Sequence, residues 1–272
     1  MRRFLIFSAL VFCLFPSFIA KADAPSREII EKVGIDQKLG GQVPLNLEFR
    51  DEYGKTVHLA DYFGSKPVIL NLVYYQCPML CTFVLNGLEK ALKPLSFSVG
   101  REFNVVTVSF NPKETPVLAS EKKQTYMKLY SRPGAEDGWH FLTGREDAIR
   151  QLAQSVGFRY TYDTASGQYA HAGGVMVLTP QGKIAQYFYG IEYSSKDLRF
   201  AMIEASSAKI GTLVDQFLLL CFHYDPMTGK YGFWIMNILR LASLAAFGVL
   251  AGFIAIMLRR EHTKTVVSGR DD

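Results

Sequence analysis

Apolar and polar positions alternate between strand-like and helix-like periods from residue 43 to residue 207. Residues 68–75 form a nearly continuous apolar run, which is typical of a strand buried on both faces. The β-branched and aromatic residues of 103–110 predict a second strand. Shorter strands are predicted as two hairpins, 43–49 with 56–59 and 175–178 with 184–189, and as a single strand at 139–142. Helices are predicted at 78–92, 113–130, 146–156 and 195–207.

Strands that alternate with helices and end in an antiparallel hairpin are typical of an α/β domain. We therefore expect a central mixed sheet that is flanked by helices. No internal repeat or low-complexity segment interrupts the sequence pattern. We interpret residues 41–210 as one globular domain that follows a linker at 25–40.

The N-terminus has the pattern of an export signal. Arg2 and Arg3 precede an uncharged stretch at 4–20, and Ala22-Asp23-Ala24 has the small-x-small pattern of a cleavage site. We interpret residues 1–24 as a signal peptide. An uncleaved membrane anchor is the alternative, because the apolar stretch is close to the minimum length for spanning a bilayer.

The C-terminus has the pattern of a membrane-spanning helix. Residues 241–258 carry no charge, aromatic residues precede them, and basic residues follow from Arg259 onward. We expect a transmembrane helix at 233–258, between a juxtamembrane segment at 211–232 and a cytoplasmic tail at 259–272. Because the positive end of such a helix stays in the cytoplasm, the domain should face the periplasm from a bacterial inner (cytoplasmic) membrane.

Composition narrows the class of protein. Of the 272 residues, 49% are hydrophobic and 20% are charged, which excludes a disordered chain, collagen and a disulfide-dense mini-protein. The formal net charge of +5 is small and dispersed, so the sequence does not indicate a nucleic-acid-binding groove. Four cysteines are too few for a framework of disulfides, so each requires its own explanation.

Cys77 and Cys81 lie where the first buried strand meets the following helix. With Pro78 at the first helical position, Cys77 would be the N-cap, where the helix dipole and free N–H groups stabilise a thiolate. The β-carbons would lie about 5–6 Å apart on one helix face, whereas an unstrained disulfide holds them about 3.8 Å apart. This spacing favours one soft ion, Cu(I) or Zn(II), over a stable disulfide. A structural disulfide in an exported protein is the alternative.

A third metal ligand must come from elsewhere in the chain. The part expected outside the cytoplasm contains His58, His140, His171 and His223. His171 precedes two glycines and the strand at 175–178, and loops at the ends of central strands face the turn that carries the cysteines. We therefore predict His171 as the third ligand, which would suit copper in either oxidation state. His58 and His140 are interpreted as a hairpin residue and a strand residue.

Three motifs surround these candidate ligands. They are Val73-Tyr-Tyr-Gln-Cys-Pro-Met-Leu-Cys81, Val106-Thr-Val-Ser-Phe-Asn-Pro-Lys-Glu-Thr-Pro116, and His171 followed by Val175-Met-Val-Leu-Thr-Pro-Gln-Gly-Lys183. Together they resemble the Sco/SenC family, thioredoxin-like proteins that handle copper during assembly of cytochrome c oxidase. The resemblance covers about residues 40–210. It implies a thioredoxin-like fold, copper bound by Cys77, Cys81 and His171, and a redox cycle in which the two cysteines form and break a disulfide.

The resemblance also implies a function and a partner. The chain would be a copper metallochaperone or thiol-redox factor for the copper site of a respiratory cytochrome c oxidase. Its partner would be the copper-bearing subunit of the oxidase or another copper carrier, and copper would be bound as Cu(I) or Cu(II). The alternative is a periplasmic thiol–disulfide oxidoreductase that acts on exported cysteines without a stable metal. A peroxidase of the same fold superfamily and a redox sensor are further alternatives.

The chain departs from the pattern that it resembles. Met79 and Thr82 stand where the family usually has an acidic residue and a proline, and Asn111-Pro112 stands where it typically has Asp-Pro. The expected membrane anchor follows the domain, whereas familiar members carry it before the domain. These departures change the charge around the site more than they change the expected fold.

A second group of soft ligands, Cys221, His223 and Met227, lies between the domain and the expected anchor. All three side chains are acceptable to Cu(I), so a second copper site at the membrane surface is one hypothesis. The other hypothesis, which we favour, assigns Cys221 to an apolar helix end and residues 225–229 to a turn.

Overall fold

The structure is a computed structural model of the 272-residue chain. It describes residues 32–207, 222–225, 230–233, 240, 243–254 and 256–257. The expected signal peptide at 1–24 and the expected tail at 259–272 lie outside these residues. Of the expected juxtamembrane segment, the structure describes the backbone of two antiparallel strands, β11 (Phe222–Asp225) and β12 (Lys230–Phe233).

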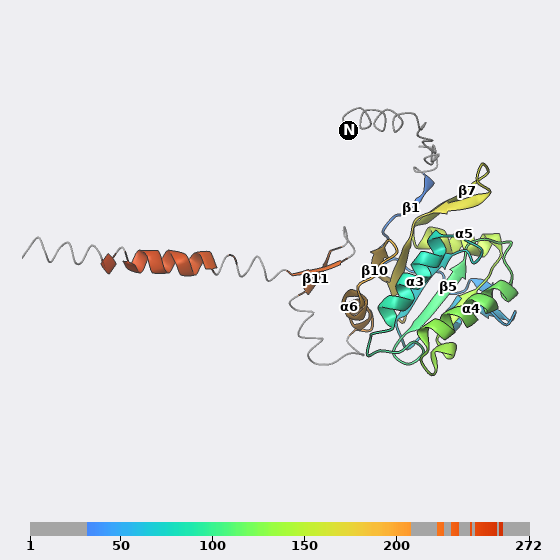
Figure 1. The fold of residues 1–272 in the computed structure, drawn as a ribbon, viewed down its shortest axis with the longest axis horizontal. Coiled ribbons are helices and arrows are strands. Elements are labelled where there is room, and N and C mark those ends of the chain that lie inside the picture. The colour runs from blue at the N-terminus through green and yellow to red at the C-terminus, as the bar shows by residue number, and fades with distance from the viewer. Residues whose placement is uncertain are drawn as a thin grey trace, which may run out of the picture.

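A five-stranded mixed sheet forms the centre of the domain, in the order β10-β9-β4-β5-β6 (Figure 1). Its strands are β4 (Val68–Val73), β5 (Asn104–Ser109), β6 (Trp139–Leu142), β9 (Gly174–Leu178) and β10 (Ile184–Tyr189). Strands β4, β5 and β6 run parallel, while β9 is antiparallel to β4 and β10 is antiparallel to β9. All six residues of β4 are buried, as its continuous apolar run predicts. The predicted α/β class with a mixed sheet is confirmed.

Four helices follow strands of the central sheet along the chain. They are α3 (Leu80–Leu92), α4 (Pro116–Tyr130), α5 (Glu146–Ser155) and α6 (Ser195–Ala205). Since crossovers between parallel strands are right-handed as a rule, α3 and α4, which follow the parallel strands β4 and β5, are expected on the same face of the sheet. Helix α3 packs against both α4 and α6, whereas α5 packs against another strand, β7 (Figure 1). This arrangement leaves the start of α3 close to the ends of the central strands.

Two smaller sheets lie beside the central one. A hairpin of β2 (Glu48–Arg50) and β3 (Thr56–His58) confirms the N-terminal hairpin, and a 3-10 helix, η2 (Leu59–Tyr62), follows it. The second sheet, β1-β7-β8, contains β1 (Gly34–Ile35), β7 (Phe158–Asp163) and β8 (Gln168–His171). The β7–β8 hairpin was not predicted from the sequence, and it carries His171.

Helix α4 begins three residues later than predicted, at Pro116 instead of residue 113. The Asn111 side chain accepts the N–H of Lys113 at 3.1 Å, and the Asn111 carbonyl accepts the N–H of Glu114 at 3.1 Å. These bonds form a turn in place of a first helical turn. Proline then takes the first helical position, where a missing N–H costs little. The loop before α4 therefore contains Glu114.

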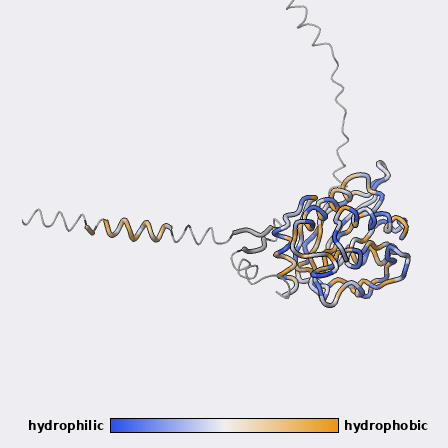
Figure 2. The backbone as a smooth tube through the Cα atoms, turned by 60° about the horizontal axis from the view of Figure 1, so that its bottom comes forward, coloured by the Kyte–Doolittle hydropathy of each residue, from blue (hydrophilic) through white to orange (hydrophobic). Residues whose placement is uncertain are grey.

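Residues 243–254 are helical, and their side chains are exposed. Figure 2 shows that this segment is largely hydrophobic. The expected transmembrane helix at 233–258 lies only partly within the described residues. None of the helices that the structure describes is both long enough and apolar enough to cross a bilayer.

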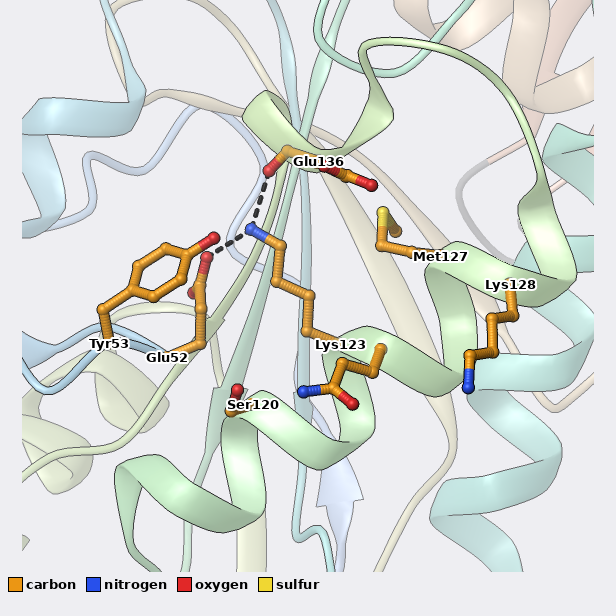
Figure 3. A pocket seen from close by; sticks show the side chains of 8 residues that line it. Glu52, Tyr53, Ser120, Lys123, Met127, Lys128 and Glu136 are labelled. Carbon is orange, nitrogen blue, oxygen red and sulfur yellow. Dashed lines mark hydrogen bonds and ion pairs between the residues drawn. The ribbon is translucent and has the colours of Figure 1, made fainter.

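A buried ion pair joins α4 to the β2–β3 hairpin. The Lys123 ammonium contacts the Glu52 carboxylate and also donates to the carbonyl of Glu136 at 2.6 Å (Figure 3). The other Glu52 oxygen accepts the N–H of Phe141, in β6, at 3.0 Å. Lys123 and Glu52 are only 6% and 4% exposed, so each charge depends on the other for compensation.

We predict that Lys123→Met lowers the free energy of unfolding by about 3–5 kcal/mol, because it leaves the Glu52 carboxylate buried without its cation. Urea unfolding followed by circular dichroism measures this change. The double variant Glu52→Gln/Lys123→Met should recover much of the loss, since no charge is then left buried. A double variant as unstable as Lys123→Met would contradict this account of the pair.

Candidate metal centre

Cys77 lies in a turn between β4 and α3 and not at the helix N-cap. Helix α3 begins at Leu80 and its N-cap is Met79, so the predicted N-cap role of Cys77 is wrong. The chain first makes a turn in which the N–H of Cys77 donates to the carbonyl of Tyr74 at 3.2 Å. This turn delays the helix by two residues and places the Cys77 side chain in front of the first helical turn.

The helix start nevertheless acts on the Cys77 sulfur as predicted. The N–H of Cys81, in the first turn of α3, donates to Cys77 Sγ at 3.4 Å. The backbone of Met79 also contributes to lowering the pKa of Cys77. Such N–H groups have no partner within the helix and stabilise a negative charge at its N-terminus. Cys77 therefore accepts the bonds that a capping side chain accepts, from a position outside the helix.

Cys81 and His171 meet although they are 90 residues apart in the sequence. The Cys81 Sγ lies 3.1 Å from His171 Nε2 and accepts the N–H of Tyr74 at 3.2 Å. His171 is the last residue of β8, not a loop residue as predicted. All three candidate ligands are buried, with 8%, 2% and 8% of Cys77, Cys81 and His171 exposed.

Glycines allow the connection from β8 to β9 to pass close to its neighbours, as predicted. A β-carbon at Gly173 would lie 3.0 Å from the carbonyl oxygen of Gly190 and 3.2 Å from Val84 of α3. A β-carbon at Gly174 would lie 2.8 Å from the carbonyl oxygen of Phe188. Any larger residue would push the end of β8, and with it His171, away from α3.

Aromatic rings hold the imidazole of His171 in place. Phe110, which directly follows β5, is fully buried with its ring centre 5.1 Å from that of His171. The same phenylalanine contacts Tyr160 of β7 at 4.7 Å and Tyr169 of β8 at 5.6 Å. Tyr74 approaches the imidazole edge-on at 6.0 Å. The packing of the β7–β8 hairpin on Phe110 therefore fixes the position of the ring.

Hydrogen bonding selects the tautomer of His171 that can coordinate a metal through Nε2. Its Nδ1 lies 2.9 Å from the carbonyl oxygen of Ala172, which can only accept, so Nδ1 carries the proton in the neutral ring. The lone pair of Nε2 then faces Cys81. A histidine that binds a metal through one nitrogen usually donates the other N–H to such an acceptor. The ring is thus oriented to coordinate through Nε2.

The pKa values of the two cysteine side chains are shifted in opposite directions. A hydrogen bond from the Cys81 side chain, with further bonds from backbone N–H groups, lowers the pKa of Cys77 to about 3. Burial, followed by the hydrogen bond to Cys77, raises the pKa of Cys81 far above its ordinary value. The metal-free reduced site therefore contains one thiolate, Cys77, and one protonated thiol, Cys81.

The donor set fits one soft metal ion. Within the part of the chain that the structure describes, Cys77, Cys81 and His171 form the one group of three or more Cys, His, Asp or Glu ligands with metal-binding spacing. Their ligand atoms all lie within 4.8 Å of one another. Two sulfurs bound to one ion at about 2.3 Å lie roughly 4 Å apart, so small side-chain shifts suffice. Both cysteines are free thiols in the structure.

The other sequence candidates do not join this group. His58 is exposed in β3, and His140 is in β6 with its ring 4.3 Å from that of Tyr62. Both fit the strand or hairpin roles predicted for them. Cys221 and Met227 lie outside the described residues, and only the backbone of His223 is described, in β11. The second copper site therefore stays a hypothesis.

Sequence reasoning missed two residues that shape the site. Tyr74 donates its N–H to Cys81, and burial, followed by the Cys77 side chain, raises the pKa of the Tyr74 hydroxyl. Glu114 accepts the N–H groups of Tyr75 and Gln76, just before Cys77. The Tyr-Tyr-Gln sequence before the first cysteine could have indicated that a turn, and not the helix itself, directly precedes Cys77. Nothing in the sequence connects Glu114 to that turn, because the contact spans 38 and 39 residues.

Fold and site together define an α/β domain with a buried dithiol–imidazole centre. The family model of SCO1/SenC matches residues 37–204, so the chain belongs to the SCO1/SenC family. The central sheet and its helices are consistent with the thioredoxin-like fold of this family. No curated protein matches the sequence.

Several solved structures are similar in fold to this chain. A putative electron transfer protein from Aquifex aeolicus VF5 is 28% identical, with a TM-score of 0.55 over 63% of this chain and 96% of that chain. BsSco, described as a member of the Sco family of cytochrome c oxidase assembly proteins with a disulfide switch, is 20% identical. Its TM-score is 0.51 over 64% of this chain and 99% of its own. Arabidopsis thaliana ScoI, solved with copper bound, is 22% identical with a TM-score of 0.47 over 62% and 98%.

We predict that Cys77 of the reduced, metal-free protein stays a thiolate between about pH 5 and pH 8. Its pKa of about 3 lies below this range, so the charge is lost only as the pH falls toward 3. The difference in ultraviolet thiolate absorption between the wild type and Cys77→Ser measures this state. A flat difference across the range is expected. A rise centred near pH 8–9, as for an ordinary thiol, would contradict the assignment.

Proposed function

We propose that the protein binds one copper ion through Cys77, Cys81 and His171 and handles it during maturation of the copper site of a respiratory cytochrome c oxidase. The observation that carries the proposal is the convergence of two sulfurs and one imidazole nitrogen within 4.8 Å. Membership of the SCO1/SenC family supports the choice of process, since BsSco is described as a member of the Sco family of cytochrome c oxidase assembly proteins.

The chemistry of the donor set supports copper as cargo. Thiolates are soft ligands that suit Cu(I), and adding an imidazole suits copper in either oxidation state. Three protein ligands leave room for a ligand from a partner, which exchange between two proteins requires. Binding also requires that the Cys81 thiol lose its proton, so uptake of the ion should release a proton.

The unlike thiols support a second function for the same residues. A thiolate at Cys77 can attack a disulfide of a partner and form a mixed disulfide, with release of one partner thiolate that takes up a proton. Cys81, once deprotonated, can then attack Cys77 and release the second partner thiol. The two electrons gained by the partner disulfide come from the Cys77–Cys81 pair, which becomes oxidised. Such an exchange would let the protein reduce oxidase cysteines before it delivers copper.

We also propose that the domain faces the periplasm and is held at the bacterial inner membrane by the segment at 233–258. Support comes from the sequence alone, from the uncharged run at 241–258 with basic residues after it and from the signal pattern at 1–24. A copper-bearing subunit of an oxidase in the same membrane would be within reach of a domain anchored in this way.

Anaerobic titration of the full-length protein with Cu(I) tests the proposal. We expect one equivalent to bind tightly to the wild type, and Cys77→Ser and Cys81→Ser to lose that tight equivalent, because each removes a soft ligand. Competition with a chromophoric Cu(I) chelator measures the affinity. Unchanged stoichiometry and affinity in both variants would reject the site as the place of copper binding.

His171→Ala separates copper handling from thiol exchange. Copper affinity should fall by more than about 100-fold, because the loss of a direct ligand should exceed the 10- to 100-fold effect of losing a hydrogen-bonded neighbour of a ligand. The rate at which the reduced protein reduces a model disulfide should change far less, since both thiols remain. Equal losses of both activities would show that the imidazole serves both processes and would remove the basis for separating them.

A further inference from the structure

Glu114 is a buried carboxylate that accepts hydrogen bonds from the turn that carries Cys77 and from the end of β5. It stands in the loop between β5 and α4, directly before the N-cap Thr115, and is 6% exposed. Its Oε2 accepts the N–H of Tyr75 at 2.7 Å and the hydroxyl of Ser109 at 2.5 Å. Its Oε1 accepts the N–H of Gln76 at 2.8 Å.

The backbone donors of the turn can be accounted for completely. The N–H of Tyr74 goes to the Cys81 sulfur, and the N–H of Cys77 closes the turn on the carbonyl of Tyr74. The two N–H groups between them, of Tyr75 and Gln76, go to Glu114. Consecutive N–H groups that point at one anion form a small cradle for negative charge. The shape of this turn therefore depends on a side chain from a different loop.

Without the Glu114 carboxylate, the N–H groups of Tyr75 and Gln76 would lose the acceptor that they share. The N–H of Tyr75 is buried, so without Glu114 it would have to find another partner or remain unpaired. Either outcome changes the backbone one or two residues before Cys77. The Cys77 sulfur would then lose its alignment with the first turn of α3 and with the other two ligands.

We propose that Glu114 is a positioning residue that holds the turn from Tyr74 to Cys77 in the shape that aims the Cys77 sulfur at Cys81 and His171 before the metal arrives. This inference rests on the proposed function, because it assigns Glu114 a role in the affinity of that copper site. Glu114 makes no bond to the three ligands themselves. It acts through the backbone and lowers the reorganisation that binding requires.

The test compares Glu114→Gln and Glu114→Asp with the control variant Glu121→Gln in the full-length protein. Gln keeps the size of the side chain but points an amide NH₂ at one of the two backbone donors, and Asp keeps the charge but is one methylene shorter. Glu121 lies in α4 and is exposed, so its substitution makes the same chemical change away from the turn. Circular dichroism establishes that each variant is folded.

We expect Cu(I) affinity in the order wild type, Asp, Gln, with a loss of about 10- to 100-fold for Glu114→Gln, the range for a residue that orients a ligand. The sulfur-to-copper charge-transfer spectrum of the Cu(II) form should shift in both variants, which a change in stability alone would not produce. Glu121→Gln should match the wild type. Wild-type affinity and spectrum in folded Glu114→Gln would overturn the proposal. If Glu114→Gln does not fold, wild-type affinity and spectrum in Glu114→Asp would overturn the proposal.

A measurement without metal separates this proposal from the proposed function. Hydrogen–deuterium exchange of peptides that contain Tyr75 and Gln76 should become at least about ten-fold faster in metal-free Glu114→Gln, because two N–H groups lose a charged acceptor. The same peptides in Glu121→Gln should exchange as in the wild type. A wild type that binds no copper would end the proposed function, whereas unchanged exchange in Glu114→Gln would end the role of Glu114 in holding the turn.

Discussion

The site depends on one contact between distant segments, the approach of His171 Nε2 to within 3.1 Å of Cys81 Sγ. The two residues are 90 positions apart, and neither strand β8 nor helix α3 would bring them together alone. Phe110 makes the contact possible, because its fully buried ring packs against His171 and against Tyr160 of the neighbouring strand. A hydrophobic contact thus determines the position of a polar ligand. The site can therefore be assembled in the folded protein before any metal is present.

The unlike thiols explain how one small centre could serve two kinds of chemistry. Cys77 carries the negative charge because hydrogen bonds converge on its sulfur, and Cys81 stays protonated mainly because it is buried. A single charge in a buried site is less costly than two. A soft cation brings the charge that allows the second thiol to ionise, so metal binding and proton release are coupled. In the absence of metal, the same pair presents one nucleophile and one resolving thiol.

The departures from the family pattern are consistent with this division of charge. Met79, which replaces an acidic residue, is 62% exposed at the start of α3 and adds no charge beside the sulfurs. Asn111, which replaces an aspartate, uses its side chain to accept the N–H of Lys113. Glu114 brings a carboxylate to the turn before Cys77 from the same loop as Asn111. The negative charge near the dithiol therefore comes from a buried residue that is already hydrogen-bonded.

The sequence by itself determined the local features of this protein. The apolar runs located β4 and β5, the patterns around them located the helices within a few residues, and the spacing of Cys77 and Cys81 indicated a thiol pair at a strand–helix junction. Local periodicity can do this because it reports which side chains are buried.

Tertiary structure decided the rest. The β7–β8 hairpin, with its half-exposed residues, gave too weak a periodic signal, and α3 begins late because the turn before it is held by Glu114 and by the Cys77 sulfur. His171 was predicted as the third ligand from its place before a core strand and from the family resemblance, and it does lie beside the cysteines. Periodicity does not report which distant segment covers a buried face, so the hairpin that carries His171 and the contact of Glu114 with the turn appeared only in the folded chain.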